Sequence, residues 1–209
     1  MGRPRDPQRI EARRAEVGAA TLRTISALGI EGASLRAIAQ QGGFTTGTLA
    51  YYFSNKQEIL LFAGRTVLRS LVARLAAALS GHTTLRSLEK ALLDELPATS
   101  DTRLGWQIWL AFTARVPSDA DYRQEHEQRY AEIRTLVRNN LNAAARAGNL
   151  AKGIDRAAEV DQILSLFDGL GLHALLEPEH FPPVRQRRQL RRAIRALERP
   201  RPTRKGEPM

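Results

Sequence analysis

Hydroxyl, aromatic and basic side chains gather between residues 45 and 56, in the run TTGTLAYYFSNK. Small hydroxyl side chains beside a glycine permit a close approach to the major groove of DNA and to phosphate oxygens. The tyrosines and the lysine that follow can add contacts to the phosphate backbone. This is the chemistry of binding, so the run is the first candidate for a nucleic-acid contact.

The residues that could carry catalysis or hold a metal ion form no familiar pattern. The chain has no cysteine, which excludes a disulfide, a thiolate metal site and a thiol nucleophile. His126 and Glu127 are followed by Tyr130, where a zinc protease would carry a second histidine. No glycine-rich phosphate loop and no G-x-S-x-G motif is present. We therefore expect no enzyme activity, cofactor or metal site, with a helical enzyme kept as a distant alternative.

Apolar residues recur at helical spacing along the chain, and no segment alternates as a strand would. Ser34 and Thr45 are predicted N-caps, and Ser54 with Gln57 is predicted to form a capping box. The expected helices cover approximately residues 7–28, 35–41, 46–52, 55–79, 85–96, 102–116, 119–147, 155–176 and 182–197. The sequence thus predicts an all-α fold of about nine helices.

The first three helices are predicted to form a helix-turn-helix. Segments 35–41 and 46–52 are too short to be stable alone, so each must pack on the first helix. Gly42 and Gly43 allow the sharp reversal between them. The apolar residues Leu28 and Leu35 are expected to face inward with that core. The start of the third helix then projects outward, as DNA binding requires.

Three segments of this region resemble the TetR family of one-component regulators: GIEGASLRAIA at 29–39, GFTTGTL at 43–49 and YFSNKQEIL at 52–60. The resemblance implies a DNA-binding transcriptional regulator, a repressor released from a palindromic operator by a small-molecule effector. It also implies a homodimer. The sequence has no segment like a signal peptide, and its most apolar stretch, 59–79, is interrupted by three arginines, so we expect a cytoplasmic protein without membrane contact. The implied DNA contacts are Ser34, Arg36, Thr45, Thr46, Gly47, Thr48, Tyr51, Tyr52 and Lys56. Ala50 stands where many members carry a phosphate-binding tyrosine, so that role passes to Tyr51.

Two of these assignments have structural alternatives. Tyr51 and Tyr52 could both be core residues, and at least one is expected to pack inward. Lys56 at a helix start opposes the helix dipole, a cost that a phosphate partner would offset.

The helix predicted at 102–116 is apolar nearly all round and carries both tryptophans, one turn apart. These residues are either core or the wall of an effector pocket. The candidate pocket residues are Phe62, Arg103, Trp106, Gln107, Trp109, Phe112, Thr113, Tyr122, His126, Tyr130 and His173. The helix at 55–79 is expected to be the only continuous link from this region to the DNA-binding helices.

The helix at 155–176 has a wider apolar surface than one core needs, so part of it is expected to bury against a second copy of the chain. The predicted dimer interface comprises Ile163, Phe167, Leu170, Gly171, Leu190 and Ile194. This half resembles the BetI-type branch of the family, which senses choline-like ligands, through WLAF at 109–112, FDGL at 167–170 and LLEPE at 175–179. The sequence itself does not identify the effector.

The net charge of +10 is concentrated at the two ends of the chain. Residues 184–209 hold ten basic and two acidic residues, whereas residues 15–183 have a net charge of −1. The last helix is expected to dock its apolar face and solvate its arginines; binding to anionic membrane or nucleic acid is the alternative. A sequence-neutral basic nucleic-acid-binding protein is therefore the rival to the regulator.

The expected organisation has three parts. A DNA-binding domain covers 9–69, with its helix-turn-helix motif at 34–53. A ligand-binding and dimerisation domain covers 70–198, and a basic tail at 199–209 is expected to be disordered because it has three prolines and no large aliphatic residue.

Overall fold

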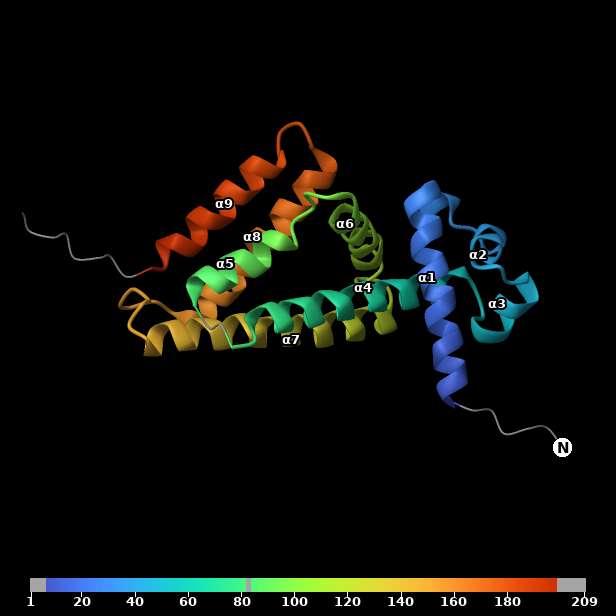
Figure 1. The fold of residues 1–209 in the computed structure, drawn as a ribbon, viewed down its shortest axis with the longest axis horizontal. Helices are drawn as coiled ribbons and strands as arrows, with labels where there is room; N and C mark the ends of the chain where they lie inside the picture. Colours follow the sequence, from blue (N-terminus) through green and yellow to red (C-terminus); the bar gives the residue numbers. More distant parts are fainter. Residues whose placement is uncertain (1–6, 82–83, 199–209) are drawn as a thin grey trace, which may run out of the picture. The chain divides into compact units, whose positions relative to one another are not determined.

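The computed structural model describes residues 7–81 and 84–198, with side chains from residue 10 onward. This part of the chain folds into helices and, apart from one isolated antiparallel bridge between Leu150 and Glu198, contains no β-structure. The helices are α1 (Pro7–Gly32), α2 (Leu35–Gly42), α3 (Thr46–Tyr52), α4 (Lys56–Leu79), α5 (Leu85–Asp94), α6 (Ser100–Thr113), α7 (Ala120–Arg146), α8 (Arg156–Leu176) and α9 (Pro183–Ala196) (Figure 1). The prediction of an all-α fold with about nine helices is confirmed. The predicted disordered tail lies outside the described residues.

The chain divides into two compact units. The first unit consists of Met1–Leu71 and Thr99–Arg129, and the second of Val72–Ala98 and Tyr130–Met209. Helices α4 and α7 contribute to both units, and α6 belongs to the first. Because these units follow packing and not chain order, the sequence-based domain limits at 9–69 and 70–198 stay a prediction.

The core of the first unit joins the three N-terminal helices to α6. Val17 of α1, Ile38 of α2 and Leu49 of α3 are almost completely buried in one cluster, and Ile108 of α6 belongs to the same cluster. Burying such side chains supplies the stability that short helices lack on their own. Helix α4 spans both units, and α6 also contacts α1 directly, so the tryptophan-bearing helix reaches the N-terminal helices by packing as well as through the chain.

The end of α1 differs from the predicted pattern. Gly29 has a left-handed φ of 72°, which interrupts the helix one residue after its predicted end, and the chain then regains helical geometry up to Gly32. Leu28 is 59% exposed and Leu35 is 37% exposed, so the expectation that they face inward is wrong. The interruption ends the inward stripe of α1, and α2 buries Ile38 and Ala39 instead.

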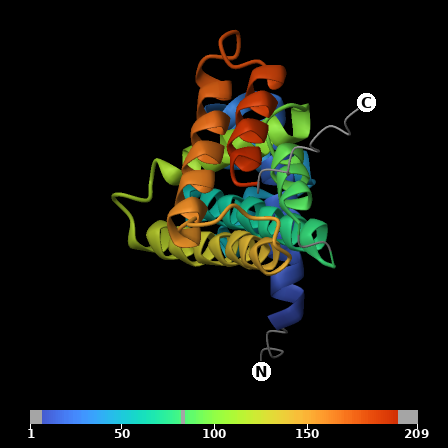
Figure 2. The same ribbon diagram turned by 90° about the vertical axis from the view of Figure 1, so that its left-hand side faces the viewer.

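In the second unit, α9 packs against α5 and α8 (Figures 1 and 2). Its apolar face, formed by Leu190 and Ile194, is fully buried, while most of its arginines are exposed. The predicted docking of this helix is confirmed. None of the described helices is both long enough and apolar enough to cross a membrane.

Candidate functional site

Local hydrogen bonds cap the starts of α2 and α3. The Ser34 Oγ accepts from the Ala37 N–H at 3.1 Å, and the Thr45 Oγ1 accepts from the Thr48 N–H at 3.0 Å, so both predicted N-caps are confirmed. Gly43 ends α2 with a left-handed φ of 67°, a conformation that costs other residues a steric penalty. The two caps fix where α2 and α3 begin, and Gly43 fixes where α2 ends.

Most of the predicted DNA-contacting side chains lie on the surface of this segment. Ser34, Arg36, Thr45, Thr46, Gly47 and Tyr51 are exposed, whereas Thr48, Tyr52 and Lys56 are half-buried. Thr48 also shares a hydrogen bond of 2.9 Å with Thr45 through the two hydroxyl oxygens. The first turn of α3 therefore presents small hydroxyl groups to solvent, and the Thr45 cap fixes the backbone at this position.

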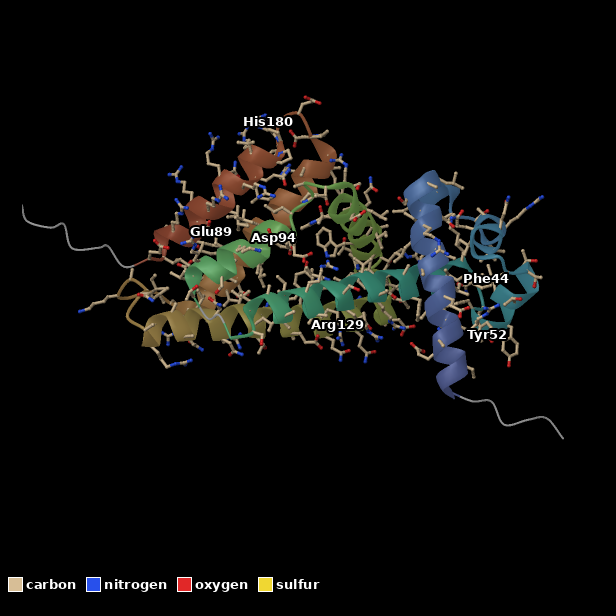
Figure 3. The ribbon with its side chains drawn as sticks, viewed as in Figure 1. Phe44, Tyr52, Glu89, Asp94, Arg129 and His180 are labelled. Atoms are coloured by element: carbon tan, nitrogen blue, oxygen red, sulfur yellow. The ribbon has the colours of Figure 1, made fainter. Side chains whose placement is uncertain are left out.

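The two tyrosines at the end of α3 have different environments. Tyr51 is 58% exposed, while Tyr52 packs against the buried cluster of the first unit. Their rings meet edge to face, with centroids 4.8 Å apart. Figure 3 labels Tyr52 beside α3, together with Phe44, which precedes the helix. Tyr51 is thus the more exposed of the two tyrosines, and Tyr52 is mainly a packing residue.

The start of α4 is capped one residue later than predicted. The Asn55 Oδ1 accepts from the Glu58 N–H at 2.9 Å, and the Glu58 Oε2 accepts from the Ser54 N–H at 2.7 Å. The predicted capping box of Ser54 with Gln57 is therefore wrong, because Asn55 and Glu58 supply the oxygens. Glu58 also pairs with Arg14 of α1 at 2.9 Å. Although burial raises the pKa of Glu58, the Ser54 N–H and the Arg14 guanidinium lower it below its ordinary value.

Lys56 contacts the end of α1. Its Nζ donates to the backbone oxygens of Ile30 and Glu31 at 3.4 and 3.5 Å. Carbonyl oxygens at a helix end carry partial negative charge, so they offset the unfavourable position of Lys56 at the start of α4. A phosphate is not needed to explain this lysine.

The aromatic candidates for the effector pocket cluster on α6 and its neighbours in the first unit. Trp106 is buried, and its ring lies 5.0 Å from that of the half-buried Trp109. Phe112 is buried with its ring 5.0 Å from that of Tyr122, whose hydroxyl donates to the Gln57 oxygen at 3.1 Å. Because Tyr122 lies on α7 and Gln57 on α4, this group of rings connects three helices.

The polar candidates on these helices are less consistent with a pocket. Gln107 is exposed, and the Thr113 hydroxyl donates to the Trp109 and Leu110 oxygens of its own helix at 3.0 Å. The polar Arg103 and His126 are half-buried, as is the aromatic candidate Phe62. Among the residues that the structure describes, no three His, Asp or Glu side chains lie close enough together to hold a metal ion.

A buried carboxylate ties α4 to α7 in the same unit. Glu125 is 6% exposed, and its oxygens lie 3.0 Å from the Arg65 Nε, 3.3 Å from the Arg129 Nε and 3.8 Å from the Arg69 Nε. Arg129 is labelled in Figure 3. This cluster was not predicted, because Arg65 and Arg69 come from a helix far from Glu125 in the chain.

Two predicted pocket residues, Tyr130 and His173, belong to the second unit, so the candidate set is divided between the units. The Tyr130 hydroxyl donates to the Asp168 carboxylate, 3.0 Å from each oxygen. His173 is exposed, 2.9 Å from Glu177, and its ring stacks on Phe181 at 4.8 Å. His173 therefore lies on the surface of its unit.

Asp168 was not among the predicted site residues. Burial raises its pKa from 3.8 to about 7, against the lowering effects of the Tyr130 hydroxyl and the Arg134 charge. Arg134 itself pairs with Asp161 at 3.3 Å. The sequence signal that could have identified it is its position between Phe167 and Gly169, as the one charged residue of the stretch 163–172.

The six residues predicted for a dimer interface are all buried within their own unit. Ile163, Phe167, Leu170, Gly171, Leu190 and Ile194 pack inside the chain, so they cannot face a partner. This correction follows from the docking of α9 against α8 and α5, which covers that side of α8. The accessible stripe of α8 holds Leu166, Gly169, Leu172, His173 and Leu176.

Known protein families match both the N-terminal and the C-terminal part of the chain. The family model described as the C-terminal part of BetI-type transcriptional repressors matches residues 85–198, and that of bacterial regulatory proteins of the tetR family matches residues 12–62. The transcriptional regulator PksA of Bacillus subtilis is 30% identical over 190 residues, 90% of each chain. BetI of Burkholderia ambifaria is 31% identical over 171 residues, 79% of this chain and 84% of that one. A Saccharomonospora viridis transcriptional regulator in complex with choline has a similar structure, with a TM-score of 0.81, 23% identity and coverage of 91% of this chain and 99% of that one.

Proposed function

Because this chain belongs to the TetR family of bacterial transcriptional regulators, with a BetI-type C-terminal region, we propose that it is a repressor that binds a palindromic operator as a homodimer and releases it when a small molecule binds. The observation that carries the proposal is the first turn of α3, where capped and exposed hydroxyl side chains are followed by the exposed Tyr51. No enzymatic activity is part of this function, and the place of action is the cytoplasm, where the DNA lies.

We assign the DNA contact to those predicted residues that are exposed in the structure. Thr45, Thr46 and Gly47 approach the major groove, and Tyr51 donates to a phosphate oxygen. A two-fold dimer places two such helices on half-sites about 34–36 Å apart, or a multiple of that spacing. Footprinting of the DNA upstream of the gene should therefore show a paired, palindromic site. A single unpaired half-site, or no preferred sequence, would contradict the proposal.

The two tyrosines offer a matched test of the DNA contact. Tyr51→Phe removes an exposed hydroxyl and should weaken binding to operator and non-operator DNA alike, because phosphate contacts carry no sequence information. Tyr52→Phe removes a half-buried hydroxyl one residue later and should leave affinity close to wild type. Fluorescence anisotropy with both duplexes measures this difference. A change in sequence preference caused by Tyr51→Phe would show that the residue contacts bases.

The dimer contact is assigned to the accessible stripe of α8. A Cβ added at Gly169 would meet no atom within 4 Å, and Leu176 is 61% exposed, so this face is open and partly apolar. Gly169→Arg should therefore fold normally, dissociate the dimer and abolish operator binding. Ala131→Arg, at an exposed position of α7, is the control. Sedimentation that shows the wild type as a monomer at micromolar concentration would contradict the assignment.

The effector site is assigned to the aromatic group on α6. Tryptophan faces bind quaternary ammonium groups through cation–π attraction, and the solved relative from Saccharomonospora viridis was crystallised with choline. Since α6 packs on α1 within the first unit, a ligand beside Trp106 and Trp109 can alter the DNA-binding helices directly. A coupling free energy of about 1–3 kcal/mol would change operator affinity by about 5–150-fold.

Tryptophan fluorescence tests this assignment, because both tryptophans of the chain lie on α6. Choline that releases the operator should change the emission, and Trp109→Phe should weaken the response while sparing DNA binding without ligand. If choline releases the operator and leaves the emission unchanged, the effector site lies elsewhere and α6 is only a core helix.

A further inference from the structure

The outward face of α9 is a dense array of guanidinium groups. The helix carries six arginines and no acidic residue over Pro183–Ala196. Gln186, Leu190 and Ile194 form the buried face, so the arginines occupy the remaining circumference. They are Arg185, Arg187, Arg188, Arg191, Arg192 and Arg195. In Figure 3, nitrogen-tipped side chains are seen along this helix.

One carboxylate balances this charge within the described residues. Glu89 of α5 lies 3.3 Å from the Arg191 Nε and 3.4 Å from the Arg195 Nε. Arg185 donates to the His180 oxygen at 3.0 Å, which is a neutral group. No ion pair involves Arg188 or Arg192 within the same residues, and both are exposed. The face therefore keeps several uncompensated positive charges.

We propose that the outer face of α9 is a second, sequence-independent contact surface for the phosphate backbone of duplex DNA. This surface is distinct from α2 and α3. The proposal goes beyond operator recognition and does not depend on which operator or effector the protein uses. Its role is to hold the regulator on DNA of any sequence through charge alone.

Charge complementarity favours the phosphate backbone as the occupant. Arginine presents a planar fork of N–H donors that matches two phosphate oxygens. Arg188 and Arg192, which have no ion pair within the described residues, lie about 6 Å apart along the helix axis, at 1.5 Å per residue. Each DNA strand offers a phosphate about every 3.4 Å of the duplex axis. A spacing of about 6 Å is close to two such steps, so these two arginines can contact alternate phosphates of one strand.

A membrane surface is the less favourable occupant. Helices that bind at a bilayer surface insert an apolar face among the lipids. The apolar face of α9 is already buried in the protein, with Leu190 and Ile194 at 0% exposure, and Val184 is its one large hydrophobic side chain on the surface. The sequence immediately after α9 adds Arg199, Arg201, Arg204 and Lys205, which extends the run of basic residues.

The experiment uses the full chain and a duplex of about 20 base pairs without an operator. Arg188→Gln with Arg192→Gln removes two exposed charges and leaves the Glu89 contacts intact. Each lost phosphate contact lowers the slope of log Kobs against log salt by about 0.9, so the double variant should lose about 1.8. Across a fourfold salt range this corresponds to a change of about tenfold in the salt effect. Circular dichroism and thermal melting verify that the variant is folded.

Two further variants separate charge from other effects. Arg138→Gln with Arg146→Gln removes two exposed charges from α7 and should leave the slope at its wild-type value. Arg188→Lys with Arg192→Lys keeps the charge and should also retain the slope. A slope of the Arg188→Gln, Arg192→Gln variant equal to wild type would overturn the proposal, even with the operator footprint intact. Loss of binding to phosphatidylglycerol vesicles with unchanged DNA slopes would assign the face to membrane and would also overturn it.

Discussion

The two units of the molecule bury different polar groups. In the first unit, the starts of α2 and α3 are closed by Ser34 and Thr45 within three residues, and the buried Glu125 faces several arginines. In the second unit, the largely buried Asp168 receives a hydrogen bond from a neutral tyrosine. Asn140 is 1% exposed, and neither atom of its amide has a hydrogen-bond partner within the described residues.

This difference has an energetic consequence. A buried polar group with its hydrogen bonds made costs little, whereas one without them costs roughly 1–3 kcal/mol. In the first unit the helix starts are capped, whereas the buried Arg65 Nε and Glu125 Oε1 have no hydrogen-bond partner within the described residues and are stabilised by ion pairs. The second unit contains groups whose free energy a proton, a water molecule or a ligand can lower. Replacing Asp168 or Asn140 is accordingly expected to stabilise the protein, and replacing the capping Thr45 to destabilise it.

The largest effect is expected at Asp168. Because its pKa in the folded protein is about 7, above the ordinary value of 3.8, the folded state holds a proton that the unfolded state releases. The stability from this group is complete below about pH 4 and is lost as the pH rises to about 7, by up to about 1.4 kcal/mol per pH unit. Asp168→Asn should remove this slope and stabilise the protein at pH 8 by up to about 4 kcal/mol.

Urea unfolding between pH 5 and pH 8 measures the slope. Asp161→Asn is the control, because that carboxylate has 69% of its side chain exposed and should show no comparable effect. Equal slopes for wild type and Asp168→Asn would show that the carboxylate is adequately solvated or paired. That result would contradict the prediction that its burial makes the stability depend on pH.

The next effect is expected at Asn140. Replacing it with leucine removes two unsatisfied polar atoms from the core of α7 and should raise the free energy of unfolding by about 1–3 kcal/mol. Asn139→Leu, at the exposed neighbouring position, should change stability by less than about 0.5 kcal/mol. Destabilisation by Asn140→Leu in thermal melting would mean that the amide has a bound water or ligand.

A loss of stability, smaller in size, is expected in the first unit. Thr45→Ala removes the oxygen that caps α3 and should cost about 1 kcal/mol. Thr45→Ser keeps the oxygen and should retain most of that stability, while Thr46→Ala removes an exposed hydroxyl that caps nothing. Equal free energies of unfolding for Thr45→Ala and Thr46→Ala in chemical denaturation would show that the cap does not stabilise α3.

The smallest effect is expected at Lys56. Its hydrogen bonds to the Ile30 and Glu31 oxygens are long and partly exposed, so Lys56→Met should cost about 0.5 kcal/mol. If Lys56 also contacts a phosphate, the salt slope for DNA binding should fall by about 0.9. Lys152→Met, at an exposed position, is the control for both measurements. An unchanged slope would assign Lys56 a structural role alone.

Local signals explain why the DNA-binding segment was predicted well. A cap depends on residues within one turn, and a glycine turn depends on the conformation of one residue, so both can be identified from the chain alone. Ser34, Thr45 and Gly43 all act as their types suggest. The prediction for the start of α4 was wrong because two residue pairs can cap the same helix start. The predicted pair was Ser54 and Gln57, and the structure uses Asn55 and Glu58.

Contacts between helices were not predictable in the same way. The sequence indicated that α8 has two apolar sides, but the packing of α9 and α5 decided which of them is buried. The same holds for the Glu125 cluster, for Asp168 with Tyr130, and for the contact of α6 with α1.

The sequence by itself determined the helical fold, the caps of the DNA-binding helices and the family to which the chain belongs. Tertiary structure alone decided which of two neighbouring tyrosines is exposed, which face of α8 is open and which carboxylate is buried. The physical reason is the distance along the chain over which each interaction acts. Capping and turn formation act over three or four residues, whereas burial depends on the neighbours that distant segments bring, and a helical repeat of 3.6 residues does not specify which neighbour covers which side.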